Sequence, residues 1–126
     1  MVDLDRLCHV CGRPLDGPQT CRHPVCPSCA ADRARGRKRL ARRAHRNRKR
    51  AYAKGLPGQF SADDIRALWR SQQKRCAGCS RHLGTLYASP PGYHVDHVEA
   101  LAASGSNSRA NIQLLCPSCN LRKGAR

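Results

Sequence analysis

The cysteines are the residues whose spacing indicates a definite chemistry. The chain of 126 residues contains nine of them. Eight form four Cys-x-x-Cys pairs, namely Cys8 with Cys11, Cys26 with Cys29, Cys76 with Cys79, and Cys116 with Cys119. Such a pair places two thiolates on one side of a tight turn, at the separation that a tetrahedral Zn²⁺ ion requires. The four pairs therefore predict two structural zinc sites of four cysteines each.

The first of these sites leaves alternatives open. Its simplest ligand set has 14 residues between the two pairs and consists of Cys8, Cys11, Cys26 and Cys29. Cys21 and His23 lie between the pairs and are competing ligands, whereas in the simple quartet Cys21 is a spare thiol. A single zinc site, a disulfide framework and redox-active pairs are the other interpretations of the nine cysteines.

Composition favours metal over disulfides as the support for a thin core. Only 4% of the residues are aromatic and 25% are charged, and a small core of this kind usually needs a metal or disulfides. The chain begins without the basic and apolar regions of a secretory signal. We therefore expect the reducing cytoplasm, or the host cytoplasm for a viral protein, where disulfides are uncommon. No long apolar run is present, so we expect no membrane partner.

Basic residues are concentrated in one segment. The formal net charge is +16, from 24 Lys and Arg against 8 Asp and Glu. Residues 33–54 hold 12 of the 24 basic residues and no acidic one. This predicts a nucleic-acid-binding arm in preference to a merely solvated one, with candidate contacts Arg39, Arg42, Arg43, Arg46 and Arg50. Alanines favour a helix here, but repulsion between like charges predicts an arm that is only partly helical on its own.

Further elements are expected after the arm. Glycine and proline at residues 55–58 predict a break in the chain. A helix is predicted over residues 61–74, with Ser61 as its N-cap, Asp64 completing a capping box and Trp69 on its apolar face. Two short strands are predicted at residues 93–98 and 111–115, followed by a short helix after Cys116.

Three separated elements in this C-terminal half resemble the motif of the HNH endonuclease family. They are Asp96-His97, the run from Asn111 to Cys116, and Cys119-Asn120 followed by Lys123. The upstream Cys76/Cys79 pair is similar to the zinc-containing branch of the family. The resemblance extends over roughly residues 75–124. It implies a small α+β, metal-stapled fold, in which a treble-clef-like ββα-metal module follows an N-terminal zinc-knuckle module and a basic helical arm.

The resemblance also implies catalytic roles. Phosphodiester hydrolysis needs an activated water, a cation at the developing charge and groups that orient the phosphate. His97 would be the general base, since an imidazole accepts a proton near neutral pH. Asp96 and Asn120 would hold a catalytic Mg²⁺ or Mn²⁺ through hard oxygen atoms. Asn111 would fix the loop between the strands and thereby the orientation of His97.

Neighbouring residues complete this expected site. Arg122 and Lys123 are expected to contact phosphate. His94 lies two residues before Asp96, so both side chains lie on one face of a regular strand. We expect an exposed strand histidine there, and an extra metal ligand is the alternative.

Three modules are predicted: a zinc knuckle at residues 1–31, an arginine-rich arm at 32–58 and an HNH nuclease of the small phage or bacterial type at 59–126. The expected reaction is metal-dependent hydrolysis of DNA with low sequence specificity. A monomer should nick one strand, and double-strand cleavage would need a homodimer or an accessory partner. The alternatives are a non-catalytic zinc-binding adaptor for nucleic acid, in packaging or regulation, and a nuclease that cleaves RNA.

Overall fold

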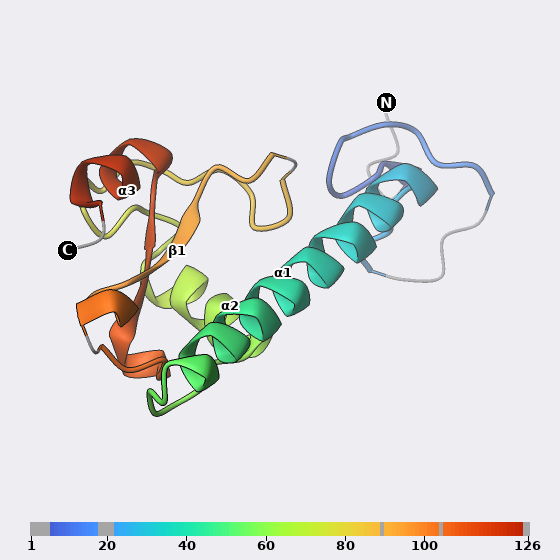
Figure 1. Cartoon of the computed structure of the whole chain (residues 1–126). Coiled ribbons are helices and arrows are strands. Elements are labelled where there is room, and N and C mark those ends of the chain that lie inside the picture. The colour runs from blue at the N-terminus through green and yellow to red at the C-terminus, as the bar shows by residue number, and fades with distance from the viewer. Residues whose placement is uncertain (1–5, 18–21, 89, 104, 125–126) are drawn as a thin grey trace. The chain divides into compact units, whose positions relative to one another are not determined.

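The computed structural model describes residues 6–17, 22–88, 90–103 and 105–124. Its elements are α1 (Pro27–Ala53), α2 (Ala62–Ser71), β1 (His94–His97), the 3-10 turns η2 (Leu101–Ala103) and η3 (Arg109–Asn111), β2 (Ile112–Leu115) and α3 (Pro117–Lys123) (Figure 1). The chain divides into two compact units, residues 1–35 and 36–126, with the boundary inside α1. None of the described helices is long and apolar enough to cross a membrane. The predicted small α+β fold is confirmed.

The basic segment forms α1, a continuous helix of 27 residues, where the sequence predicted only partial helicity. Leu40 and Ala44 of this helix are buried in the core of the second unit. Because most helix stability in proteins comes from packing of an apolar face, this burial offsets the repulsion between the arginines. The predicted division into modules at residues 1–31, 32–58 and 59–126 concerns function and stays a prediction.

The second helix begins with the predicted capping box. The backbone N–H of Asp64 donates to Ser61 Oγ (3.2 Å), and the backbone N–H of Ser61 donates to Asp64 Oδ2 (2.8 Å). α2 ends at Ser71 rather than at residue 74. Gln73 and Lys74 have φ angles of 53° and 60°, in the left-handed region, and this conformation cannot continue a right-handed helix.

The strands β1 and β2 form an antiparallel hairpin within the predicted ranges. Asp96 pairs with Gln113, and His97 pairs with Ile112. The short helix α3 contacts both strands. Because side chains alternate along a strand, successive residues of β1 present their side chains to opposite faces of the hairpin.

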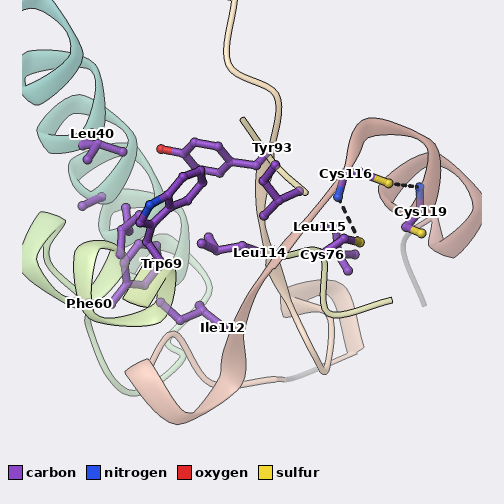
Figure 2. Packing of buried hydrophobic residues seen from close by; sticks show 13 residues of the cluster. Leu40, Phe60, Trp69, Cys76, Tyr93, Ile112, Leu114, Leu115, Cys116 and Cys119 are labelled. Carbon is purple, nitrogen blue, oxygen red and sulfur yellow. Dashed lines mark hydrogen bonds between the residues drawn. The ribbon is translucent and has the colours of Figure 1, made fainter. Parts of the chain in front are cut away.

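One core joins α1, α2 and the hairpin to the second cysteine quartet (Figure 2). Its most buried members include Ile65, Tyr93 and Leu114, each at most 1% exposed. The rings of Trp69 and Tyr93 lie with their centroids 5.2 Å apart. Residues 36–53 of α1 are therefore held against the hairpin by apolar packing within the second unit.

Candidate functional site

The second cysteine quartet has the geometry of a zinc site. Its four Sγ atoms lie within 4.8 Å of one another and belong to Cys76, Cys79, Cys116 and Cys119. The Sγ atoms of Cys79 and Cys116 are 3.8 Å apart. Zn–S bonds of about 2.3 Å in a tetrahedron require sulfur atoms about 3.8 Å apart. The quartet therefore fits Zn²⁺, as its spacing predicted.

Backbone donors and burial act in opposite directions on these thiols. Burial raises the pKa of Cys76, but the backbone N–H groups of Cys116, Cys79 and Gly78 outweigh it and lower this pKa to about 6. Burial and the neighbouring thiols raise the pKa of Cys119 to about 12. Four thiolates so close together repel one another, and a dication removes that repulsion. The donor set thus matches a bound Zn²⁺.

The first quartet repeats the arrangement of the second. Its ligands are Cys8, Cys11, Cys26 and Cys29, the simple set that the spacing predicted. Both quartets end in the sequence Cys-Pro-Ser-Cys, which begins a helix in each case. The N–H of Cys26 donates to Cys8 Sγ (3.3 Å), and the N–H of Cys116 donates to Cys76 Sγ (3.2 Å). His23 stacks beside His9 outside the quartet, and Cys21 lies outside the described residues.

Each quartet also has an arginine beside it. Arg13 Nε donates to Cys11 Sγ (3.3 Å). A guanidinium nitrogen of Arg122 donates to Cys119 Sγ (3.0 Å). A zinc ion with four thiolates carries a net charge of −2, so both guanidinium groups stabilise the loaded sites. Arg122, which the sequence suggested as a phosphate contact, is therefore also a neighbour of the zinc cluster.

Asp96 is held on the face of β1 that meets α3. Its Oδ2 atom accepts hydrogen bonds from Gln113 Nε2 (2.9 Å) and from Lys123 Nζ (2.9 Å). The Asp96 side chain is 11% exposed. Lys123 Nζ also donates to the backbone carbonyl of His97 (2.5 Å). Lys123 therefore links α3 to both residues of the Asp-His pair, a contact that the sequence assigned to phosphate.

His97 has a partner that the sequence analysis missed. Its Nε2 lies 2.8 Å from Oδ1 of Asn107. Because an amide oxygen only accepts, Nε2 carries the proton and Nδ1 of the neutral ring is the basic nitrogen. Asn107 is fully buried, and among the described residues its Nδ2 has no hydrogen-bond partner. The Gly- and Ser-rich surroundings of Asn107 indicated only a loop.

The predicted break at residues 55–58 supports the loop of Asn107. The backbone N–H of Asn107 donates to the carbonyl of Pro57 (2.9 Å). Gly58 has a φ of +88°, and a Cβ atom there would lie 2.8 Å from the backbone nitrogen of Ser108. The close approach of the two backbones therefore requires glycine.

Asn111 cross-links the same loop. Its Oδ1 accepts the backbone N–H of Glu99 (2.9 Å), and its Nδ2 donates to the carbonyls of Glu99 (2.9 Å) and Ser106 (2.6 Å). The loop between the strands is thus closed at its base by one amide. This arrangement is what the predicted loop-fixing role of Asn111 requires.

Asn120 of α3 lies beside His94 of β1. Asn120 Nδ2 donates to His94 Nδ1 (2.8 Å), which leaves the amide oxygen, the atom that binds cations, outside this bond. His94 is half-buried, so it is not the exposed strand residue that we expected. The structure thus brings Asn120 and Lys123 of α3 to one face of β1, with His94 and Asp96.

The chemistry of these donors fits a hard divalent ion. Asp96 supplies a carboxylate and Asn120 an amide oxygen, the ligand types that Mg²⁺ and Mn²⁺ prefer. Among the described residues, only the two cysteine quartets bring three or more His, Cys, Asp or Glu ligand atoms together. An ion at Asp96 and Asn120 would therefore have few protein ligands and would keep positions for water and phosphate.

The predicted basic contacts on α1 fall into two cavities of the second unit. Arg43, Arg46 and Arg50 line a cavity of about 310 Å³ together with His94 and Asn120. Arg39 and Arg42 line another of about 340 Å³, which Arg43 and Arg46 share. Three of the five predicted contacts thus lie at the same cavity as two residues of the candidate site.

Comparison with known proteins adds one finding to this geometry. Neither the curated proteins nor the solved structures give a match to the chain. Members of the HNH endonuclease family are typically nucleases. A family model with the description HNH endonuclease matches residues 76–126, the segment that contains the second cysteine quartet, β1, β2 and α3.

Proposed function

We propose that the C-terminal module is a metal-dependent endonuclease that hydrolyses phosphodiester bonds of DNA. The observation that carries the proposal is the link made by Lys123, which joins α3 to Asp96 Oδ2 and to the carbonyl of His97. This link holds the carboxylate of Asp96 and the backbone of His97 beside the helix that bears Asn120. The match of residues 76–126 to the HNH family supports the same reading.

His97 is the general base of the proposed reaction. Asn107 holds the proton on Nε2, so Nδ1 accepts a proton from the attacking water. The water oxygen bonds to phosphorus, the bond from phosphorus to the 3′ oxygen breaks, and that oxygen takes a proton from solvent. The products are a 5′-phosphate and a 3′-hydroxyl, as in the HNH family.

The other residues position the substrate and the base. Asp96 and Asn120 would hold Mg²⁺ or Mn²⁺, which when bound supplies Lewis acidity at the phosphate oxygens and the leaving oxygen. Asn111 keeps the loop closed behind His97. The two zinc sites are structural, since all four positions of each are cysteines.

The substrate is bound mainly through its phosphates. The 12 basic residues in the segment 33–54 predict binding that weakens steeply with salt and depends little on sequence. A single hairpin-and-helix unit acts on one strand, so the monomer nicks a duplex. Cleavage of both strands would require a second copy or an accessory protein.

A supercoiled-plasmid assay tests this function. The full chain is incubated with plasmid and Mg²⁺ or Mn²⁺, and conversion to the nicked form is compared for wild type, His97→Ala and the control His45→Ala, an exposed histidine of α1. We expect nicking by wild type and control but not by His97→Ala, with DNA binding unchanged in all three. DNA binding without nicking by wild type would support the adaptor alternative instead. Preferential cleavage of an RNA of the same sequence would reassign the substrate.

A further inference from the structure

The helix α1 brings three arginines to the candidate active site, although the sequence suggested a separate arm. Arg43, Arg46 and Arg50 are three and four residues apart and lie on one helical face. They line the cavity of about 310 Å³ that also contains His94 and Asn120. Leu40 and Ala44 anchor this part of α1 in the core, so the arginines have a fixed position relative to the hairpin.

The positive charge of this cavity favours the binding of an anion. Its described lining contains three guanidinium groups and no carboxylate. None of the ion pairs found in the described part of the second unit involves Arg43, Arg46 or Arg50. Arg43 is half-buried, and its burial lowers its pKa. Like charges at this spacing repel one another, and a bound anion would remove the repulsion.

The extent of the basic surface indicates a chain of anions rather than one. Arg43 and Arg46 also line the adjoining cavity of about 340 Å³, where Arg39 and Arg42 follow. The stretch from Arg43 to Arg50 covers about 10 Å of helix axis at a rise of about 1.5 Å per residue. One strand of B-DNA advances about 3.4 Å per nucleotide, so this stretch corresponds to about three nucleotides.

We propose that α1 is the second wall of the active site and that Arg43, Arg46 and Arg50 hold the phosphates that flank the scissile bond of a DNA strand. This inference rests on the proposed nuclease function and deepens it. The three arginines are positioning residues, because they fix the register of the strand beside Asn120, the proposed metal ligand, rather than react. Their loss should therefore lower the rate of cleavage by bound enzyme as well as the affinity.

The test compares two pairs of substitutions that remove the same charge from α1 of the full chain. The site pair is Arg46→Gln with Arg50→Gln, two exposed residues whose replacement leaves the core intact. The control pair is Arg37→Gln with Lys49→Gln, also exposed and in neither cavity. Both pairs should reduce the slope of log affinity against log salt by about 2, since each phosphate contact contributes about 0.9.

Only the site pair should lower kcat, by about tenfold or more at saturating plasmid, and Arg46→Lys with Arg50→Lys should recover part of it. Equal kcat values for site and control pairs would overturn the inference while leaving the nuclease function standing. Absence of nicking by the wild type would contradict both the proposed nuclease function and the inference about the arginines. Zinc content and far-UV circular dichroism of each variant show whether the fold is retained, and the lysine variants provide the decisive comparison if the glutamine variants do not fold.

Discussion

Asn107 Oδ1 lies 2.8 Å from Nε2 of His97, and this contact selects which nitrogen of the imidazole is basic. Nothing in the chemistry of the Asp-His pair alone makes that selection. The buried amide also has a cost, because its Nδ2 has no partner within the described structure. A buried polar group kept at such a cost indicates a positioning role for Asn107 toward His97.

Replacing Asn107 by Leu should separate activity from stability. Leu has the same number and branching of side-chain heavy atoms as Asn, and it removes both the acceptor for His97 and the unpaired Nδ2. The two changes in hydrogen bonding, each worth about 1–3 kcal/mol, act in opposite directions on the free energy of unfolding. We expect that free energy, from urea titration, to change by less than about 2 kcal/mol, while kcat for plasmid nicking falls about a hundredfold.

The control for this substitution is Ser108→Ala in the same loop. Ser108 Oγ bonds Ser106 Oγ (2.8 Å) and does not bond His97. We expect kcat to stay within about twofold of wild type. Full activity of Asn107→Leu would show that the imidazole is oriented by other contacts.

Substitution of Asn120 tests its proposed role as a metal ligand. Asn120→Ala removes the amide oxygen, so the concentration of Mg²⁺ or Mn²⁺ that gives half-maximal nicking should rise at least tenfold. Asn120→His replaces the amide by an imidazole and should keep nicking while shifting the preference toward Mn²⁺, which binds imidazole better than Mg²⁺ does. Nicking by Asn120→Ala with an unchanged metal requirement would exclude Asn120 as a ligand.

Loss of zinc from one cysteine quartet should leave zinc binding at the other quartet unchanged. Cys11 and Cys79 are the exposed ligands at equivalent positions of the two quartets. Cys11→Ser and Cys79→Ser should each reduce the zinc content from two ions to one per chain. Because zinc binding supplies much of the folding free energy of such small modules, Cys79→Ser should abolish nicking whereas Cys11→Ser should retain it. Metal analysis and the plasmid assay check both outcomes, and loss of nicking in both variants would show that the quartets are coupled.

Gly36 of α1 is a position where substitution by Ala should destabilise the protein, although Ala has a higher helix propensity than Gly. Replacing a glycine in the interior of a helix by Ala usually stabilises by about 1 kcal/mol. A Cβ atom at Gly36, however, would lie 2.4 Å from Cβ of Tyr87. Gly36→Ala should therefore lower the free energy of unfolding, measured by urea titration. In a Tyr87→Gly background, which lacks that Cβ atom, the same substitution should be neutral or stabilising, and a penalty that persists there would mean that the contact is not its cause.

The sequence allowed the zinc ligands to be predicted and the motif residues to be located, because both depend on local spacing, while the catalytic roles of the motif residues stay predictions. Two Cys-x-x-Cys pairs need only approach each other to form a site, and Cys8, Cys11, Cys26 and Cys29 do so as predicted. Asn107 and the full length of α1 could not be predicted in this way. The first depends on a loop that folds back to His97, and the second on apolar packing of Leu40 and Ala44 across the core. The sequence around Asn107 indicated only a polar loop, and the sequence of α1 indicated repulsion between its basic side chains.

Each quartet begins with a Cys-x-x-Cys pair and ends at the start of a helix, but the two quartets differ in the chain that separates their pairs. In the first, 14 residues separate Cys11 from Cys26, and in the second, 36 residues separate Cys79 from Cys116. The hairpin with Asp96 and His97 lies in the longer connection, while the backbone-to-sulfur hydrogen bonds are the same in both quartets. A clamp of this kind orients the helix after it whatever length of chain it encloses. The same cysteine arrangement thus encloses two different connections in one chain, and in the second quartet the enclosed hairpin is itself part of the supporting core.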